Sequence, residues 1–360
     1  MLCLKKNAYS AVDQILNENF FLNPASLNLI QKTQFLIGDV FISPKLEFNG
    51  TTSLGSGRVV SKTHDMLPYL LTAYRFKERI VAAITITPSA YGHINWSKNS
   101  IVREATTTTK LFYYRIGAQS SYQLTDKLAI GVGVNLHYNL RGELDFVVPN
   151  IGNQINKMSG INHSVDAGLY YKINSHNVLS FAIYTAVNTF GRGSSSLGAI
   201  AVNNFYLNII EAPVAYMGLQ HVLSEKWSAE GKIYWSGWSI EKNVSFINKT
   251  NGSSTFPANW RDIWSFQLAM RYAITERIAW LSSIIYETNP VPTITNQIGY
   301  PLSASGAISA GFDINLNKEF STQLFYGYGK FIPNAKINNS NSIGSIAVNF
   351  QSVGLQIKYK

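Results

Sequence analysis

The feature that most constrains this chain is the stretch from Leu219 to Trp238, LQHVLSEKWSAEGKIYWSGW. After the polar turn Ser224-Glu225-Lys226, the odd positions from Trp227 to Trp235 are mostly apolar and the even positions are mostly polar. A period of two is the side-chain period of a β-strand. A short polar turn between two alternating strands predicts an antiparallel hairpin.

The same hairpin unit recurs along the chain. Five further short turns lie at 76–79, 124–127, 173–177, 274–277 and 316–319. Longer connections alternate with these turns, so short turns are expected at one end of the fold and long loops at the other. The pattern predicts fourteen strands, at about 34–48, 62–76, 79–96, 105–124, 127–147, 157–173, 177–192, 204–222, 226–246, 260–274, 277–288, 303–315, 319–332 and 342–359.

An even number of long strands with this asymmetry is typical of a transmembrane β-barrel. In the strand at 127–147, seven apolar residues from Leu128 to Leu140 share one face, too many for a surface that meets water. Several strands reach 15 residues or more, whereas strands of soluble sheets average about 5 to 6. The fold class is therefore predicted as all-β, a 14-stranded antiparallel transmembrane barrel, and not a soluble sandwich.

Charge then sets the orientation of the strands. Only 14% of residues are charged, against about 25% in soluble domains. A Lys or Arg on the lipid face at mid-bilayer costs about 2 to 4 kcal/mol, so Arg115, Lys232 and Arg271 should point into the barrel. We expect a polar interior of mixed charge, in which these three residues form ion pairs or meet the anionic head of a ligand.

Composition also narrows the function. The net charge of +10 comes without a cluster of basic residues and stacking aromatics, so nucleic acid is not an expected partner. The sequence contains no catalytic set, phosphate loop or metal-ligand spacing. We therefore expect no enzyme activity and no bound metal or other cofactor. The single cysteine, Cys3, allows no internal disulfide. The chain has no run of about 18 apolar residues, the length that a transmembrane helix needs. The start, MLCLKKNAYSAVDQ, lacks the apolar core of an export signal.

Two segments depart from the strand pattern. Asn23-Pro24-Ala25 predicts the start of a short helix, with Asn as N-cap and Pro at the first helical position. Pro44, Pro88 and Pro213 interrupt strands, and proline cannot donate a hydrogen bond to the ladder. Each should mark a bulge, a kink or a strand end. Around Pro88, the small residues Ser89, Ala90 and Gly92 favour either an ordinary bulge or a gap in the barrel wall.

These segments together resemble the FadL family of outer-membrane transporters for long-chain fatty acids and other hydrophobic compounds. The resemblance runs from Ala8 to Tyr359 and is carried by five segments: AYSAVDQILNENFFLNPASLNLI, ITITPSAYGHINW, QLTDKLAIGVGVNLHY, LSEKWSAEGKIYWSGWS and NWRDIWSFQLAMRYAITERIAWLSSIIYETNPVP. Asn23, Pro24 and Ala25 fall on the NPA motif of the hatch, the family's N-terminal plug.

The resemblance implies residues 1–32 as a hatch, shortened at its start, and residues 33–360 as the barrel. It implies capture of a long-chain fatty acid or similar hydrophobic molecule near the outer loops, with exit into the membrane at a kinked third strand around Pro88, Ser89, Ala90 and Gly92. The expected setting is the outer membrane of a Gram-negative cell, as a monomer among its lipids and lipopolysaccharide. The alternatives are a general porin, which needs an open lumen, an adhesin acting through its loops, and an outer-membrane phospholipase.

Overall fold

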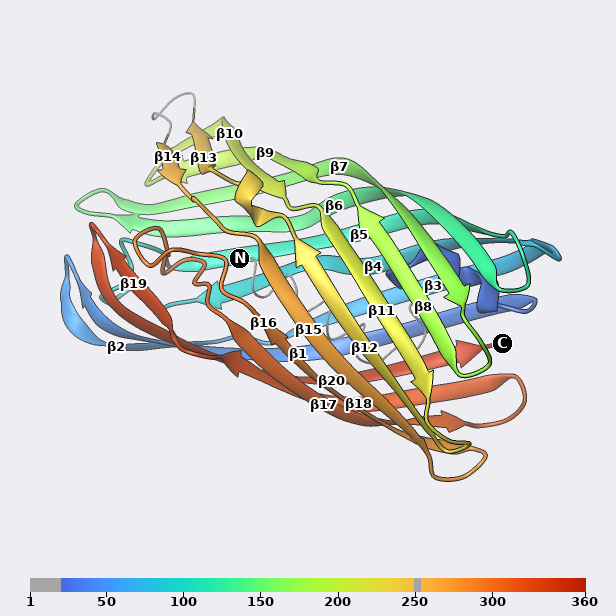
Figure 1. Ribbon diagram of the computed structural model, residues 1–360. Coiled ribbons are helices and arrows are strands. Elements are labelled where there is room, and N and C mark those ends of the chain that lie inside the picture. Colours follow the sequence, from blue (N-terminus) through green and yellow to red (C-terminus); the bar gives the residue numbers. More distant parts are fainter. Residues whose placement is uncertain (1–20, 249–253) are drawn as a thin grey trace.

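Twenty strand segments of the computed structural model join edge to edge into one closed antiparallel barrel (Figure 1). The structure describes residues 21–248 and 254–360, so the first 20 residues of the predicted hatch lie outside the described residues. Six barrel strands consist of two segments each, which gives fourteen barrel strands and confirms the predicted number. The barrel closes where β1 pairs with β20, from Phe35 opposite Tyr359 to Thr52 opposite Ser342.

The barrel strands follow the chain order and correspond one to one with the predicted ranges. They are β1 (Thr33–Thr52), β2 (Gly55–Lys62) with β3 (Asp65–Lys77), β4 (Ile80–Asn95), β5 (Thr108–Gln123), β6 (Leu128–Val148), β7 (Gly152–Lys172), β8 (Asn177–Tyr184) with β9 (Val187–Leu197), β10 (Ile200–Glu211) with β11 (Val214–Val222), β12 (Trp227–Ser236) with β13 (Asn243–Asn248), β14 (Ser254–Pro257) with β15 (Ile263–Ala273), β16 (Ile278–Glu287), β17 (Ser305–Asn315), β18 (Phe320–Phe331) with β19 (Ala335–Asn339), and β20 (Ser342–Tyr359).

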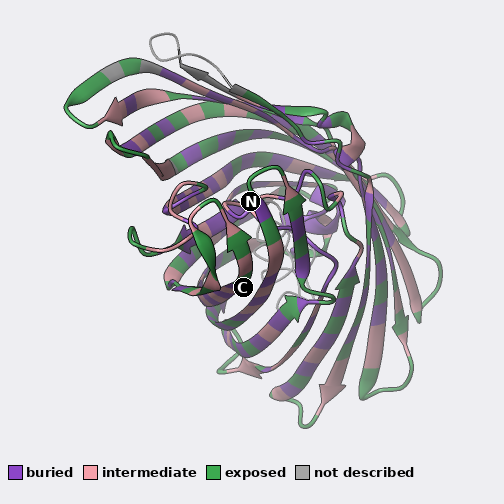
Figure 2. Ribbon diagram, turned by 90° about the vertical axis from the view of Figure 1, so that its left-hand side faces the viewer, coloured by how far each residue is buried: buried purple, intermediate pink, exposed green. Residues whose placement is uncertain are grey.

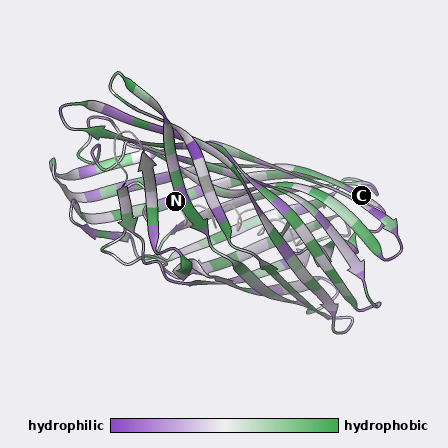
Figure 3. Cartoon of the chain, turned by 90° about the horizontal axis from the view of Figure 1, so that it is seen from above, coloured by the Kyte–Doolittle hydropathy of each residue, from purple (hydrophilic) through white to green (hydrophobic). Residues whose placement is uncertain are grey.

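The alternation read from the sequence is the alternation between the two faces of the wall. On β6, Val132 and Val134 are 61% and 59% exposed, while Asn135 and Asn139, on the other face, are fully buried. Figure 2 shows this pattern as alternating bands along most strands, and Figure 3 shows the matching change of hydropathy. The exposed apolar face suits a hydrocarbon surrounding. No helix among the described residues has the length and apolar character needed to span a membrane.

The interior corrects one expectation, because only part of it is polar. The inner face of β1, β3, β18 and β20 carries buried apolar side chains, including Leu36, Val40, Leu67, Phe325 and Phe350. A separate part, on β5, β6, β7 and β12, carries buried polar side chains, including Arg115, Asn135, Asp166, Glu230 and Lys232. On β1, the inward Leu36 and Val40 alternate with the outward Phe35 and Ile37, so both faces of that strand are apolar.

The end of the barrel with the long loops is filled by an apolar cluster. Two tryptophans, Trp238 in the short 3-10 helix η3 (Trp238–Ile240) and Trp260, meet edge to face with ring centroids 5.7 Å apart. The cluster joins strand ends to loop residues that are distant in sequence, among them Trp96, Val102, Val291, Ile298 and Leu302. The long loops therefore form a packed apolar layer over the inside of the barrel.

Candidate functional site

The helix η2 (Pro24–Leu29) lies in the segment predicted to be the hatch, a name we keep for residues 21–32, and it begins as the sequence predicts. Asn23 is its N-cap, and the Asn23 side chain accepts a hydrogen bond from the Ala25 N–H at 2.9 Å. Pro24 has no N–H to satisfy and has the backbone angle that a helix start needs. Asn23, Pro24 and Ala25 are buried, and η2 contacts β5, β6 and β7. The NPA segment is thus held inside the barrel, at the end with the short turns (Figure 1).

Two glycines of the wall allow the hatch to lie this close. Gly131 on β6 and Gly168 on β7 are directly opposite each other in the ladder. A Cβ added at Gly131 would lie 2.2 Å from the Ala25 nitrogen, and one added at Gly168 would lie 1.9 Å from the Asn23 Oδ1. Both distances are far below a van der Waals contact. No other residue type could occupy either position without moving the NPA segment.

Barrel side chains donate hydrogen bonds to carbonyl groups of the hatch, both before η2 and within it. The Arg115 guanidinium donates to the Phe21 carbonyl, the Tyr184 hydroxyl donates to the Leu22 carbonyl, and the Ser121 hydroxyl donates to the Ala25 carbonyl at 3.1 Å. Asn23 Nδ2 returns a bond of 2.9 Å to the Leu169 carbonyl on β7. Buried carbonyl groups need such partners, so these bonds fix the position of the hatch.

A second cation holds the far end of the hatch. Arg75 on β3 donates from Nε to the Ile30 carbonyl at 2.9 Å and from a terminal nitrogen to the Asn28 carbonyl. Guanidinium groups form strong, directed bonds of this kind. Both ends of the described hatch segment are therefore anchored to the barrel by arginine.

The three basic residues proposed from the sequence have different partners. Arg115 is fully buried, with its guanidinium 5.1 Å from the centre of the Tyr184 ring. Lys232 is 3% exposed and lies 3.4 Å from a Glu230 oxygen, and Arg271 lies 3.6 Å from an Asp313 oxygen. Lys232 on β12 and Arg271 on β15 are on neighbouring strands, whereas Arg115 is on β5, several strands away around the barrel. The structure does not gather the three into one cation site.

A buried carboxylate completes the polar wall. Asp166 on β7 is 5% exposed and accepts hydrogen bonds from Asn135 Nδ2 at 3.0 Å and from Gln119 Nε2 at 3.3 Å. Gly133 leaves room for it, because a Cβ there would lie 2.1 Å from Asp166 Oδ1. Asp166 thus connects Gln119 on β5 with Asn135 on β6 in one hydrogen-bonded group.

All three prolines lie where a ladder is interrupted. Pro44 is at the point where β1 changes its partner from β3 to β2, and Pro213 separates β10 from β11. Pro88 lies beside a register shift in the β4–β5 ladder, between Pro88 and Ala90.

In the described chain the β3–β4 ladder stops at Leu70 opposite Ile86. Beyond that pair, residues 61–69 and residues 87–95 face each other without a ladder, and we call this stretch the seam.

Strand β4 loses its alternation along the seam. The six consecutive residues from Thr87 to Gly92 are all buried, and this run includes Pro88, Ser89, Ala90 and Gly92. A strand in a barrel wall buries every second residue on its inner face, so six in a row are covered on both sides. The extra residue at the register shift gives the physical reason, since a bulge bends its strand.

Side chains cross the seam where the ladder is absent. Asp65 accepts a hydrogen bond from the Tyr91 hydroxyl at 2.6 Å, and its Oδ2 lies 2.7 Å from His93 Nδ1. Thr63 donates from its hydroxyl to the His93 carbonyl at 3.0 Å, and the Asn95 N–H donates to the Ser61 hydroxyl at 2.8 Å. The seam is held closed by side chains, whose bonds are fewer than those of a continuous ladder.

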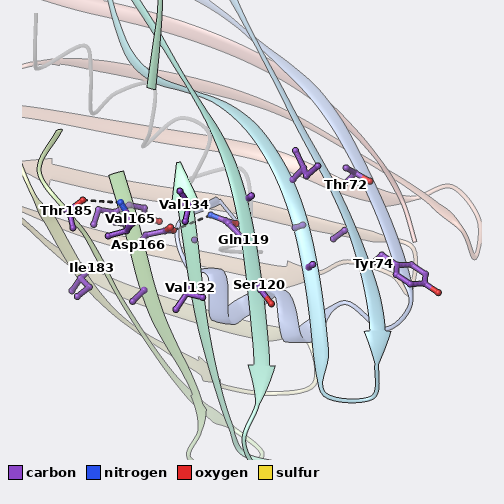
Figure 4. Close-up of a pocket in the computed structure, with 18 of the residues that line it drawn as sticks. Thr72, Tyr74, Gln119, Ser120, Val132, Val134, Val165, Asp166, Ile183 and Thr185 are labelled. Atoms are coloured by element: carbon purple, nitrogen blue, oxygen red, sulfur yellow. Dashed lines mark hydrogen bonds between the residues drawn. The ribbon is translucent and has the colours of Figure 1, made fainter. Parts of the chain in front are cut away.

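A groove of about 900 Å³ lies on the wall nearer the short turns (Figure 4). Its outer lining consists of exposed apolar residues, among them Ile84, Val132, Val165 and Ile183. Small residues such as Ala118 and Gly133 make the wall thin there, so Gln119 and Asp166 on the inner face also line it. The coil of η2 lies behind this part of the wall in Figure 4. The groove is separate from the seam.

Sequence reasoning did not identify several residues of this site. Gly131 and Gly168 carry a detectable signal, because a glycine at an inward position of a strand indicates a close approach of another backbone. Asp65, Tyr184 and Arg75 carry none, since their partners are backbone carbonyls or side chains distant in sequence.

Comparisons with known proteins agree with this architecture. A family model described as "Outer membrane protein transport protein (OMPP1/FadL/TodX)" matches residues 8–357. The long-chain fatty acid transport protein of Escherichia coli K12 is 22% identical over 386 residues, which cover 89% of this chain and 84% of that protein. Its counterpart from Salmonella typhi is 22% identical over 375 residues, covering 89% and 83%.

Solved structures share the fold at lower identity. A Pseudomonas aeruginosa FadL homologue superposes with a TM-score of 0.84 at 14% identity, covering 96% of this chain and 95% of that one. The Pseudomonas putida toluene transporter TodX gives a TM-score of 0.71 at 15% identity, covering 94% and 92%. The Ralstonia pickettii toluene transporter TbuX gives 0.73 at 13% identity, covering 95% and 93%.

Proposed function

The chain belongs to the OMPP1/FadL/TodX family of outer-membrane transport proteins, and we propose that it carries hydrophobic small molecules into the outer membrane through the seam. Membership of this family identifies a transport protein and not an enzyme. Relatives are named for long-chain fatty acids or for toluene. The proposed ligands are therefore fatty acids or other hydrophobic compounds, and the proposed setting is a monomer among outer-membrane lipids and lipopolysaccharide.

The proposed route has three parts. A ligand first partitions into the apolar layer of the long loops around Trp238 and Trp260. It then moves along the apolar inner wall, past Leu67 and Phe350. Burial of a methylene stabilises by about 0.8 kcal/mol, so a long alkyl chain needs few polar contacts on this path. The ligand finally leaves sideways between β3 and β4.

One observation carries the proposed exit: the β3–β4 ladder ends at Leu70 and Ile86 while β4 remains paired with β5. A closed barrel has no free strand edge, because unpaired backbone groups in lipid cost several kcal/mol each. Separating two strands along the seam breaks only side-chain bonds. Opening at any laddered pair of strands would break a row of backbone bonds.

The experiment alters the bulge and measures uptake. Deleting Ser89 removes the extra residue at the register shift, and Pro88→Val restores a backbone donor. Both changes should extend the β3–β4 ladder and strongly reduce uptake of radiolabelled dodecan-1-ol by cells that contain the protein. The control is Pro213→Val, which alters a strand interruption away from the seam. Uptake by the Ser89 deletion equal to that of the control would exclude the seam as exit.

The hatch gives a second test, which separates a transporter from a general porin. Scrambling Asn23-Pro24-Ala25 should displace the hatch and raise ion conductance across planar bilayers. The unaltered protein should conduct little. A large steady conductance of the unaltered protein would support the porin alternative.

A further inference from the structure

One carboxylate lies on the outer face of the wall, within the lipid-facing belt. Asp39 on β1 alternates with outward Ile37 and Phe41, which are 49% and 43% exposed. Its ladder neighbours are Leu355, 52% exposed, and Pro68, also on the outer surface. A charged group at this depth is costly and marks function more often than packing.

No cation within the described residues forms an ion pair with Asp39. Its carboxylate accepts a hydrogen bond from the Leu67 N–H at 2.9 Å. A backbone donor stabilises the carboxylate without cancelling its charge. The negative charge therefore acts on whatever passes close to it.

Asp39 also lies beside the seam. Leu67 and Pro68 belong to the part of β3 that has no ladder to β4. Asp39 therefore lies on the lipid side of the seam.

A second carboxylate lies on the inner side. Asp65 is at an inward position of β3 and crosses the seam to Tyr91 and His93. Its side chain is 16% exposed, and the imidazole of His93 is the basic group that faces it. Asp65 therefore lies on the inner face of β3 at the seam, and Asp39 lies on the outer face, on the strand next to β3.

We propose that Asp39 and Asp65 make the seam reject anions, so that the ligand leaves in an uncharged form. This inference rests on the proposed function. The exit opens into hydrocarbon, where an ionised head group is already unfavourable, and two carboxylates in a medium of low dielectric add repulsion. The preferred ligands are alkanes, alkylbenzenes, alcohols or esters. A fatty acid passes only when its carboxyl group is protonated.

The test compares two probes that differ only in the head group. Uptake of dodecan-1-ol and of dodecanoate is measured at pH 7 into cells that contain the full chain. Removal of the outer charge by Asp39→Asn should raise the ratio of dodecanoate to dodecan-1-ol uptake by on the order of tenfold. Asp39→Glu keeps the charge and should keep the ratio of the unaltered protein.

Asp65→Asn tests the inner carboxylate separately, and it still decides the question if Asp39→Asn fails to insert. Glu276→Gln, at a short turn away from the seam, is the matched loss of a charge and should leave the ratio unchanged. An unchanged ratio in both aspartate variants would overturn the inference.

The seam itself is tested independently by the Ser89 deletion, which stops uptake of both probes if the route is correct. If the deletion leaves the uptake of dodecan-1-ol intact, the proposed function fails. If the deletion blocks uptake but the aspartate variants keep the ratio, only the selectivity fails.

Discussion

The inner surface of the barrel has two walls of opposite chemistry, and the hatch lies between them. The polar wall, on β5 to β8, holds the hatch by directed bonds from Arg115 and Ser121 on β5 and from Tyr184 on β8 to its carbonyl groups. The apolar wall, on β1, β3, β18 and β20, touches Phe21, Leu27 and Ile30 through apolar contact. Directed bonds fix a position, whereas apolar contact has little directional preference.

This difference assigns a separate task to each wall. The polar wall sets where the hatch rests, and on the proposed route the apolar wall is the surface along which a hydrophobic ligand moves. The seam lies beside the apolar wall, since Leu67, Tyr69 and Tyr91 belong to that cluster. On the proposed route a ligand thus reaches the seam without passing the hydrogen bonds around Asp166.

The largest effect is expected from adding a side chain at Gly168, where the hatch lies directly against the backbone of β7. Gly168→Val places side-chain atoms where Asn23 Oδ1 lies, 1.9 Å from the new Cβ. The overlap should weaken hatch docking by about 3 kcal/mol, which raises the undocked population on the order of 100-fold. Conductance in planar bilayers should rise accordingly.

Gly231→Val is the matched control for this change. A Cβ at Gly231, on β12, has no neighbour within 4 Å, so its conductance should equal that of the unaltered protein. Equal conductance of the two variants would mean that the hatch does not lie against Gly168.

The apolar wall is tested by Phe325→Ala. Phe325 is 6% exposed, and its ring covers Gly354 so closely that a Cβ there would lie 1.5 Å from a ring carbon. Loss of the ring should lower the free energy of unfolding by about 3 kcal/mol and leave a cavity in the apolar wall. Leu324→Ala changes the neighbouring lipid-facing position, 50% exposed, and should cost about 1 kcal/mol. Denaturant titration in detergent compares the two, and equal losses would contradict a packed inner wall.

Arg115→Met tests the bond that connects the polar wall to the hatch. The Phe21 carbonyl loses a charged donor inside a buried site, which should cost about 2 kcal/mol. Arg271→Met removes a cation whose side chain is 35% exposed and should cost less than about 1 kcal/mol. Limited proteolysis near residue 21 should accelerate in the first variant only. If both variants behave alike, Arg115 does not hold the hatch.

The division into two walls also explains what could be predicted from the sequence. Alternation and turn spacing identify the strands, because the side-chain period and the turn chemistry are local. On β1 the inward Leu36 and the outward Ile37 are both apolar, so the pattern there does not say what fills the interior. For this reason the expectation of a polar interior of mixed charge is correct for only part of the inner surface.

The helix at Asn23-Pro24-Ala25 was predictable, because an N-cap and a first-turn proline act within three residues. The partners of Arg115 and Asp39 were not. Each forms a hydrogen bond to a backbone group, and backbone groups are the same at every residue. Only the fold decides which of them comes close.

The smallest effect, and the sharpest test of the polar wall, is expected from Tyr184→Phe. The variant loses the hydroxyl that donates to the Leu22 carbonyl but keeps the ring that faces the Arg115 guanidinium at 5.1 Å. Loss of one neutral hydrogen bond should lower stability by about 1 kcal/mol, less than for Arg115→Met. Hydrogen exchange of the hatch amides should increase slightly, while Tyr286→Phe, at a position 45% exposed, leaves it unchanged. A loss as large as that of Arg115→Met would show that the hydroxyl and not the guanidinium is the main anchor, and the polar wall would then hold the hatch chiefly through β8.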